Sequence, residues 1–281
     1  MEKFYTSLGL MSGTSMDGVD ASIIRSDGQG QFNNILDKYY EFDDNLHKKM
    51  VNLRNLISTK NDLIDFSEEL KILEREITIF HSEVVGDMSL KYKKNIDLVG
   101  FHGQTILHDP KNKISKQLGD GNLLSQLTKK KIVYDFRQND IKNGGEGAPL
   151  VPIFHRKIVE QKKIELPVCI LNIGGVTNIT AIGNYNKEGF LSKDLGPGNC
   201  LIDEWIRKNT KNKFDNNGEI AKKGKTNDLI LNQALDNFYN KTNQISSSFD
   251  IKDFSLGFVR GLSIEDGTAT LTEFTVRIIE A

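Results

Sequence analysis

The stretch FYTSLGLMSGTSMDGVDASII, residues 4–24, holds two apolar runs separated by a bend rich in glycine and serine. Apolar side chains alternate up to Leu10, and a second run follows from Val19 to Ile24. Two such runs with Gly, Ser and Asp between them are typical of a β-hairpin. The stretch VCILNIGGVTNITAI, residues 168–182, repeats this layout. Although glycine turns between strands are common, the recurrence favours two lobes built on similar hairpins.

Beyond the hairpins, the chain alternates predicted helices and strands. Residues 62–90 carry apolar side chains at alternating steps of three and four, which predicts one long amphipathic helix with Asn61 as its N-cap. A short apolar strand follows at 96–101, a strand predicted to be buried at 132–136, and a further helix at 263–280. This alternation indicates an α/β fold with a mixed or parallel sheet, in which binding residues tend to lie at the carboxyl ends of strands.

The composition excludes several classes of protein. The 281 residues include 37 Lys and Arg against 38 Asp and Glu, a formal net charge of -1, so no basic field favours nucleic acid. No apolar run approaches the roughly 18 residues needed to cross a bilayer, and the first residues lack the apolar segment of a secretory signal. The two cysteines, Cys169 and Cys200, have no metal-ligand spacing. We therefore expect a soluble, cytoplasmic protein that binds neither nucleic acid nor a membrane.

The bend of the first hairpin has the composition of a phosphate site. Small residues let backbone N–H groups approach an anion, hydroxyls add donors, and Asp17 is a candidate ligand for Mg²⁺, directly or through water. The lysine and the spacing of a Walker loop are absent from the bend, and an ordinary tight turn is the structural alternative. The candidate phosphate-binding residues are Gly13, Thr14, Ser15, Met16, Asp17, Gly18, Val19 and Asp20.

A second candidate cluster is the segment Asp194-Leu195-Gly196-Pro197-Gly198-Asn199. Gly-Pro-Gly turns the chain sharply after a predicted strand, and Gly198 or Asn199 opens a predicted helix that runs through Trp205. A carboxylate on the last residue of that strand, Asp194, has the position of a general base for a hydroxyl or a water. The structural alternative is that Asp194 only caps the turn.

Two further clusters contain candidate ligand-binding side chains. His102 and Gln104 lie in a predicted turn after the strand at 96–101, and we interpret them as hydrogen-bonding groups around a polar ligand. Arg137 follows the next strand and offers a bidentate fork for a carboxylate or phosphate, while Glu146 lies in the Gly-rich loop that leads to a helix near residue 150. A structural turn and a surface salt bridge are the alternatives. No serine lies in a Gly-x-Ser-x-Gly elbow, so a serine hydrolase is not favoured.

Taken together, these motifs resemble those of the bacterial anhydro-N-acetylmuramic acid kinases, and the resemblance covers essentially the whole chain in order. The matching segments are Gly9–Asp20, Phe101–Thr105, Gln117–Asp120, Asp135–Arg137, Gly145–Pro152, Leu171–Gly175 and Asp194–Asn199. The resemblance implies the two-lobed, ribonuclease H-like fold of actin, sugar kinases and Hsp70 ATPases. It also implies a reaction in which ATP and water convert 1,6-anhydro-N-acetylmuramate into N-acetylmuramate 6-phosphate during peptidoglycan recycling.

The resemblance assigns roles to the candidate residues. Gly13–Asp20 becomes the loop for the ATP phosphates with Mg²⁺ at Asp17, and Asp194 becomes the general base. We add Arg137, Gln104, Glu146 and, as a weaker candidate, His102 as contacts of the amino sugar. The expected lobes are residues 1–147, with the phosphate loop, and residues 148–281, with a connecting helix and the base. A homodimer is a further expectation.

One feature departs from the family pattern. After the helix at 263–280 the family continues with another strand, a Gly-rich adenosine motif and terminal helices, so the resemblance predicts an incomplete second lobe and weak or absent activity for this chain. The alternatives left open are a kinase or phosphatase of the same fold that acts on another sugar, and a non-catalytic module that binds muropeptides.

Overall fold

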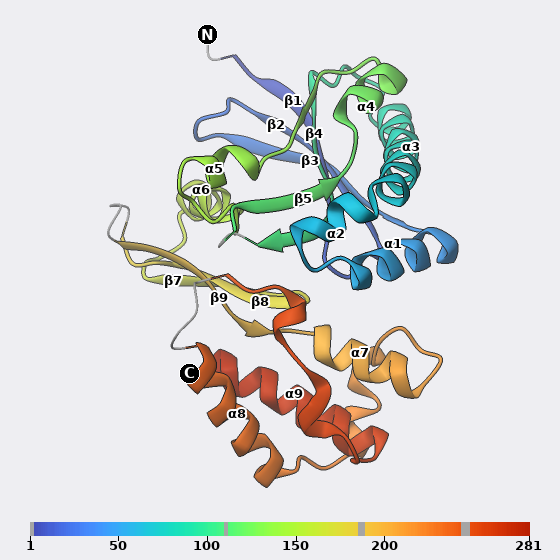
Figure 1. The fold of residues 1–281 in the computed structure, drawn as a ribbon. Coiled ribbons are helices and arrows are strands. Elements are labelled where there is room, and N and C mark those ends of the chain that lie inside the picture. The colour runs from blue at the N-terminus through green and yellow to red at the C-terminus, as the bar shows by residue number, and fades with distance from the viewer. Residues whose placement is uncertain (1–2, 110–111, 185–188, 243–247) are drawn as a thin grey trace. The chain divides into compact units, whose positions relative to one another are not determined.

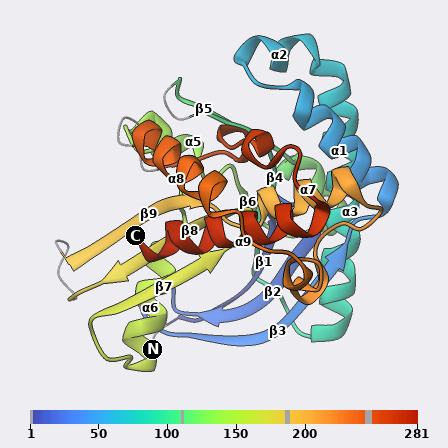
Figure 2. The ribbon, with the colours of Figure 1, turned by 90° about the horizontal axis from the view of Figure 1, so that it is seen from below.

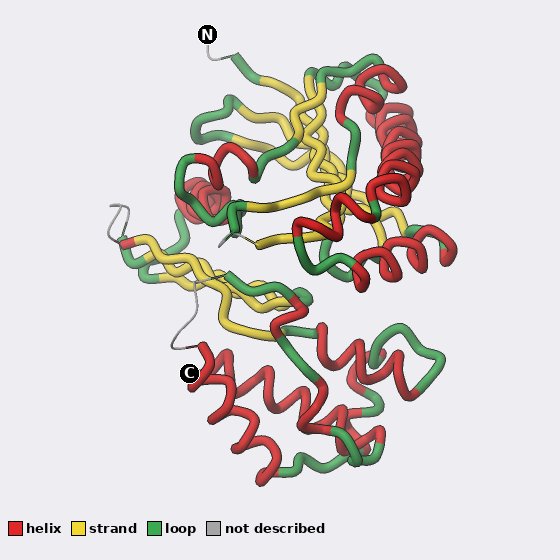
Figure 3. Tube along the Cα trace, in the orientation of Figure 1, coloured by secondary structure: helices red, strands yellow, loops and turns green. Residues whose placement is uncertain are grey.

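The computed structural model of the chain describes residues 3–109, 112–184, 189–242 and 248–281. The chain divides into two compact units, Met1–Leu150 and Val151–Ala281, each of which we describe by itself. Both units combine a β-sheet with α-helices (Figures 1 and 3), so the protein has the mixed α/β architecture that the sequence predicts. The sequence placed the division between residues 147 and 148.

The first unit contains a sheet and several helices. In chain order its elements are β1 (Tyr5–Ser12), β2 (Gly18–Ser26), β3 (Phe32–Glu41), α1 (Asp44–Leu56), α2 (Lys60–Asp65), α3 (Ser67–Tyr92), β4 (Leu98–Asp109), β5 (Ile114–Leu118), α4 (Gly121–Thr128), β6 (Ile132–Tyr134) and α5 (Gln138–Lys142). The sheet has the order β3-β2-β1-β4-β5, and β6 pairs with β4. The pairs β1–β4 and β4–β6 are parallel and the others are antiparallel, which confirms the first hairpin and the mixed sheet.

The core of this unit forms where α1 and α3 meet the sheet. Leu8 of β1, Ile23 of β2 and Phe101 of β4 are almost fully buried, together with Met50 of α1 and Ile77 of α3. Because β1 and β4 lie at the centre of the sheet with this core beneath them, the ends of both strands are held firmly in place. The bend after β1 and the polar residues of β4 therefore have a rigid support.

The predicted single helix at 62–90 is wrong, because the structure contains two helices there. The first, α2, is capped by Thr59, whose hydroxyl accepts the N–H of Asp62 in a capping box, so Asn61 is not the cap. The helix stops at Phe66, which has φ of -98° and ψ of 24° and is followed by α3. Apolar residues keep their spacing of three and four across this break, so the sequence pattern alone does not predict it. The apolar stripe itself is confirmed by the burial of Leu70, Leu73, Ile77 and Val84.

Two predictions about the strands after α3 also need correction. His102 and Gln104 do not lie in a turn, because β4 continues to Asp109 by pairing with β5 from Gln104 onward. Within it, Gly103 has φ of +70° and leaves no room for a Cβ beside the carbonyl oxygen of Leu118. The strand at 132–136 is shorter than predicted and is not buried, since β6 is an edge strand with Val133 47% exposed.

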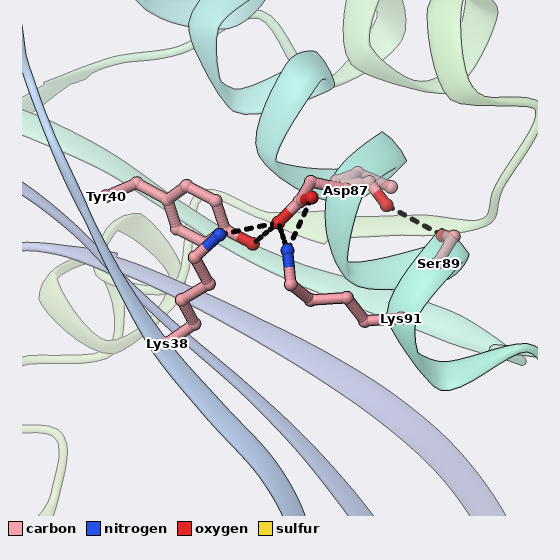
Figure 4. Close-up of polar contacts among 6 residues, drawn as sticks. Lys38, Tyr40, Asp87, Ser89 and Lys91 are labelled. Atoms are coloured by element: carbon pink, nitrogen blue, oxygen red, sulfur yellow. Dashed lines mark hydrogen bonds and ion pairs between the residues drawn. The ribbon is translucent and has the colours of Figure 1, made fainter.

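A polar cluster ties β3 to α3 at the surface of the first unit (Figure 4). The Asp87 carboxylate of α3 accepts from Lys38 Nζ at 2.9 Å, from Tyr40 Oη at 2.5 Å and from Lys91 Nζ at 2.6 Å. These three donors hold the pKa of Asp87 well below its usual value, and burial followed by the bond to Asp87 raises the pKa of Tyr40. One carboxylate thus links two strand residues to the helix.

The second unit carries a three-stranded antiparallel sheet and a group of helices (Figures 1 and 2). Its elements are α6 (Pro152–Lys162), β7 (Val168–Ile173), β8 (Val176–Ile182), β9 (Phe190–Pro197), α7 (Cys200–Asn209), α8 (Asp228–Thr242) and α9 (Ile264–Glu280), with short 3₁₀ turns at Asn216–Gly218, Ala221–Lys223, Ile251–Asp253 and Leu256–Val259. The sheet order is β7-β8-β9. Residues Val168 to Ile173 pair with Ile182 to Thr177, which confirms the second hairpin.

Helices α7, α8 and α9 share a core made of Trp205, Leu231, Leu271, Phe274 and Ile278, among others. The indole N–H of Trp205 donates to the carbonyl oxygen of Ile264 at 3.1 Å, which fixes the start of α9. The predicted helix at 263–280 is therefore confirmed. No helix within the described residues combines the length and the apolar character needed to cross a membrane.

Candidate active site

In the bend between β1 and β2, Thr14 and Ser15 are exposed to solvent, whereas the next residue, Met16, is buried. Met16 has a left-handed backbone with φ of 58°, and its N–H donates to the carbonyl oxygen of Gly13 at 3.2 Å. A methionine at positive φ needs support from its surroundings, and only 1% of Met16 is exposed. Because the core holds Met16, the intervening Thr14 and Ser15 are kept at the surface.

Two members of the predicted phosphate loop serve the packing of the sheet. Val19 is fully buried in the core of the first unit. Gly18 lies so close to the carbonyl of Tyr40 and the ring of Tyr39 that a Cβ has no space. Together with Met16, these residues can contact a ligand only through their backbone. The side chains of this loop that remain accessible to a phosphate or a metal are Thr14, Ser15, Asp17 and Asp20.

Buried donors reach the bend from beneath. Gln104 of β4, fully buried, donates its Nε2 to the carbonyl oxygen of Gly13 at 2.9 Å. Arg54 of α1, only 3% exposed, donates Nη1 to the carbonyl oxygen of Thr14 at 3.2 Å. The Oε1 atom of Gln104 is buried and has no hydrogen-bond partner within the described part of the chain. An acceptor of this kind is suited to a hydroxyl group or a water.

Asp17 and Asp20 give the bend a local negative charge. Ser15 Oγ donates to Asp17 Oδ1 at 2.6 Å, and the Tyr39 hydroxyl also bonds Asp17. Burial, followed by the charges of Asp17 and two nearby carboxylates, raises the pKa of Tyr39 to about 12. Partial burial, followed by repulsion from Asp17, raises the pKa of Asp20. A divalent cation would relieve this repulsion, so the two carboxylates fit Mg²⁺.

That metal would need further ligands from outside the protein. Among the described residues no group of three or more His, Cys, Asp or Glu side chains is placed to hold a metal ion. Mg²⁺ commonly keeps several waters and uses only one or two carboxylates, with phosphate oxygens completing its shell. The pair Asp17 and Asp20 matches this mode of binding.

A second cluster, formed by Arg137, His102 and Gly147, connects β4 to the loop after α5. Arg137 donates from Nε at 3.1 Å and from Nη2 at 2.8 Å to His102 Nε2, and from Nη1 at 2.7 Å to the carbonyl oxygen of Gly147. His102 Nδ1 lies 2.7 Å from the carbonyl oxygen of Gly103. Burial, followed by the charge of Arg137, lowers the pKa of His102 to about 4, so the ring is neutral near pH 7.

The loop around Glu146 is shaped by Asp140 of α5. Asp140 Oδ2 accepts the N–H of Gly147 at 2.8 Å, and its carbonyl oxygen accepts the N–H of Gly145 at 2.9 Å. Gly145 packs so closely on the Asp140 carboxylate that a side chain has no room. These bonds place the half-buried Glu146 between two anchored glycines, one of which also bonds Arg137.

In the second unit, Asp194 lies within β9 rather than at its last residue, because the strand continues to Pro197. It pairs with Asn178 of β8 just before an irregularity in the register. Its Oδ2 accepts the N–H of Phe249 at 2.9 Å, so the carboxylate holds a fixed orientation. Helix α7 begins at Cys200, with Asn199 as its N-cap residue.

Gly198, four residues after Asp194, packs against the turn of the second hairpin. The N–H groups of Gly198 and Asn199 donate to the carbonyl oxygens of Gly175 and Gly174 at 3.0 and 2.8 Å. Gly198 lies so close to the Gly174 carbonyl that a Cβ has no space, which explains the glycine. Thr177 Oγ1 lies nearby, buried and without a hydrogen-bond partner within the described residues. The turn Gly174-Gly175 thus positions the start of α7 and the end of β9.

Comparison with known proteins identifies the chain. The family model described as anhydro-N-acetylmuramic acid kinase matches residues 5–280. The chain belongs to this family. A protein of that name from Pelagibacter ubique (strain HTCC1062) is 57% identical over 279 residues, which are 99% of this chain and 74% of the relative. A protein of that name from Methylobacterium nodulans is 38% identical, and the match covers 97% of this chain and 76% of the relative. Another from Zymomonas mobilis is also 38% identical, and the match covers 97% of this chain and 75% of the relative.

Membership of the anhydro-N-acetylmuramic acid kinase family confirms the resemblance found in the sequence and makes the protein a carbohydrate kinase. The same comparisons do not favour a muropeptide-binding module or an enzyme for another sugar.

The structure brings most of the predicted residues of the first unit into two groups. Gln104 contacts the bend at Gly13, and His102 contacts Arg137 next to the loop of Glu146. His102 and Gln104 are two residues apart on β4, so one strand serves both groups. Asp194 belongs to the second unit, and its approach to the bend stays a prediction.

Two buried residues next to the bend were not predicted from the sequence. Arg54 follows Leu46, Met50 and Leu53, whose spacing of four and three indicates an amphipathic helix, but nothing in that pattern indicates that an arginine is buried. His81 lies on the apolar stripe of α3, and its Nε2 is 3.5 Å from Ser12 Oγ at the end of β1. Its position four residues after Ile77 is the signal that marks it as buried.

Proposed function

We propose that the chain opens 1,6-anhydro-N-acetylmuramate with water and transfers the γ-phosphoryl group of ATP to the freed O6, which gives N-acetylmuramate 6-phosphate. The observation that carries the proposal is membership of a kinase family over residues 5–280. The exposed hydroxyls and paired carboxylates of the bend support it, because they suit a magnesium-bound phosphate chain.

In this proposal the bend residues Gly13–Asp20 bind the ATP phosphates. Backbone N–H groups near Thr14 and Ser15 would donate to phosphate oxygens, and their hydroxyls would add donors. Asp17, with Asp20 beside it, would hold Mg²⁺, which supplies charge neutralisation for the transferring phosphoryl group. Phosphoryl transfer asks the protein mainly for alignment and neutralisation, and a bend pinned by Met16 has little freedom to move.

Asp194 is the proposed general base. Its carboxylate would take a proton from a water that attacks the anomeric carbon, as the bond from that carbon to O6 breaks on the opposite face. The new bond to the water oxygen replaces the bond to O6, so the carbon is inverted, and O6 becomes the nucleophile for phosphorus. The bond from the Phe249 N–H to Asp194 Oδ2 supports the assignment because it fixes the carboxylate plane.

The amino sugar would be bound by Gln104, Arg137 and Glu146, with His102 in a supporting position. The buried Oε1 of Gln104 supports a bond from a sugar hydroxyl. Arg137 carries the positive charge that the carboxylate of a muramic acid requires. Its bonds to His102 and to Gly147 support a fixed guanidinium plane rather than a mobile surface group.

We further propose that the two units are the lobes of an actin-like, ribonuclease H-like ATPase fold. Each unit contains three strands paired antiparallel in chain order, β1-β2-β3 in the first and β7-β8-β9 in the second, which supports a duplication.

The experiment that tests the proposed function is turnover in ¹⁸O-labelled water with ATP, Mg²⁺ and the anhydro sugar. We expect release of ADP and a sugar product that carries phosphate on O6 and ¹⁸O on the anomeric carbon. N-acetylmuramate, which has no anhydro bridge, is the control and should release no ADP. Absence of ADP release with the anhydro sugar, or ¹⁸O in the phosphate, would contradict the proposal.

A further inference from the structure

We propose that Arg54 is a positioning residue for the nucleotide, which holds the phosphate-binding bend in shape from beneath and supplies it with a buried positive charge. This inference rests on the proposed function, because it takes the bend at 13–20 as the site of the ATP phosphates. The arginine lies far from the bend in sequence, near the end of α1, and no motif of the bend itself includes it.

The first argument is the direction of the backbone carbonyls. Arg54 Nη1 donates to the Thr14 carbonyl oxygen at 3.2 Å, and Gln104 Nε2 donates to the Gly13 carbonyl oxygen at 2.9 Å. Both donors are buried, with 3% and 0% of the residues exposed. Two successive carbonyls are therefore drawn toward the interior. Peptide planes are rigid, so the N–H groups that follow these carbonyls, those of Ser15 and Thr14, point the other way.

The second argument is the state of those N–H groups. Within the described part of the chain, the backbone N–H groups of Thr14 and Ser15 have no protein acceptor. Both residues are exposed. A turn with successive outward N–H groups is a site for an anion, and the buried donors beneath are what keep it in that conformation.

The third argument is charge. The accessible side chains of the bend include Asp17 and Asp20, and no lysine or arginine lies between residues 4 and 24. An anion approaching this bend meets carboxylates, and Mg²⁺ offsets only part of the charge of a triphosphate. The guanidinium of Arg54 is the cation that the described contacts place directly against the backbone of the bend. Because it is buried, its field is screened less than that of a surface cation.

The test is the affinity of a non-hydrolysable ATP analogue with Mg²⁺, measured by isothermal titration for the full chain. In Arg54→Met, which keeps the length and removes the charge and the donors, we expect affinity to fall about 10- to 100-fold, the value of one hydrogen bond from a charged group. Arg54→Lys retains the charge without the fork, and we expect a loss of about 3- to 10-fold. The affinity for the anhydro sugar should change less than about threefold in both.

Two controls separate this role from a general effect on folding. Leu53→Ala removes a buried neighbour on the same helix and should lower the thermal midpoint while it leaves the affinity for the analogue unchanged. Asp17→Asn tests the bend itself. If Asp17→Asn alters nucleotide affinity but Arg54→Met and Arg54→Lys do not, the inference about Arg54 is wrong and the proposed function stands.

Other results would overturn the inference as well. Equal loss of sugar and nucleotide affinity in Arg54→Met, or the same loss of nucleotide affinity in Leu53→Ala, would make Arg54 a packing residue of α1. If Arg54→Met does not fold, the test depends on Arg54→Lys. An unchanged affinity of Arg54→Lys for the ATP analogue would refute the positioning role of Arg54. Absence of analogue binding by the unaltered chain would overturn the proposed function and this inference together.

Discussion

Arg137 directs two guanidinium nitrogens, Nε at 3.1 Å and Nη2 at 2.8 Å, to a single ring nitrogen of His102. That nitrogen can accept only if it carries no proton, so the proton of the neutral ring lies on Nδ1, which donates to the carbonyl oxygen of Gly103. The histidine is thus held in one tautomer and one orientation. A neutral acceptor fixes the guanidinium plane of Arg137 without cancelling its charge.

We predict that Arg137→Lys raises the KM for the anhydro sugar by about 10- to 100-fold, since an ammonium cannot reproduce a fork held at three points. The KM for ATP should stay within about twofold. Steady-state kinetics with each substrate varied in turn checks this. Arg277→Lys on the exposed face of α9 is the matched control and should leave both constants unchanged. If Arg137→Lys raises the KM for ATP and leaves the KM for the anhydro sugar unchanged, Arg137 does not bind the sugar.

A second prediction concerns stability and pH. Burial lowers the pKa of His81 to about 4, and burial with the charge of Arg137 lowers the pKa of His102 to about 4. Between pH 6.5 and 4 the unfolded chain therefore binds protons that the folded chain does not, so the free energy of unfolding rises with pH. Each histidine should contribute about 1.4 kcal/mol per pH unit in this window.

Urea unfolding at several pH values between 4 and 7.5 measures this slope. The contribution of the two histidines is fully present above pH 6.5 and is lost as the pH falls toward 4. His81→Gln should reduce the slope by the contribution of one histidine, whatever its effect on stability at pH 7.5. A slope that His81→Gln leaves unaltered would mean that the buried ring is not the group that titrates.

The hairpins could be predicted from the sequence because their signals are local. The alternation around Leu10 and around Ile170, with glycine and serine between the runs, specifies two strands and a turn without reference to the rest of the chain. The breaks and ends of elements could not be predicted in the same way. Phe66 fits the apolar stripe on both sides, and the residue where β4 ends depends on pairing with β5, which no local pattern records.

The same reasoning separates the parts of the site that were predicted from those that were not. Asp17 and Arg137 lie in segments whose composition is unusual, so they were found as candidates. Arg54 was missed because its burial depends on α1 packing beneath the bend, a contact between residues about forty positions apart in the chain. A charged residue on a helix is normally at the surface, and only the tertiary structure reveals the exception.

The cluster at Asp87 gives a prediction for the first unit. Asp87→Asn should lower the urea midpoint at pH 7, because Lys38 and Lys91 then lie close together without their shared carboxylate and Tyr40 loses its acceptor. Since the pKa of Asp87 is lowered in the folded state, its contribution is present above the ordinary pKa of aspartate and is lost below it. The difference between the variant and the unaltered chain should therefore shrink as the pH falls below about 4.

Glu68→Gln is a suitable control for Asp87→Asn. Glu68 pairs with Lys71 on the exposed face of the same helix, and such pairs contribute about 0 to 1 kcal/mol. The urea midpoint of Glu68→Gln should therefore match that of the unaltered chain. If Asp87→Asn behaves in the same way, the contacts of Figure 4 do not stabilise the fold.

Asp17→Asn should change the response to metal. With one carboxylate of the pair removed, more Mg²⁺ is needed for half-maximal rate, and we expect the required concentration to rise by about tenfold, the value of one charge-assisted contact. Partial burial is the main cause of the raised pKa of Asp20, and the smaller contribution, repulsion from Asp17, is also removed. Rate measured against Mg²⁺ at saturating ATP checks this, and an unchanged Mg²⁺ requirement would place the metal elsewhere.

Asp194→Asn should lower kcat by about 10²- to 10⁴-fold, the usual contribution of a positioned general base. The amide keeps the size of the carboxylate and an oxygen that accepts the N–H of Phe249, so the binding of both substrates should be retained. Single-turnover ADP release and titration with the anhydro sugar measure the two effects separately. Asp236→Asn, at an exposed position of α8 in the same unit, is the control and should retain full turnover. A loss below tenfold in Asp194→Asn, with sugar binding intact, would assign proton removal to another group.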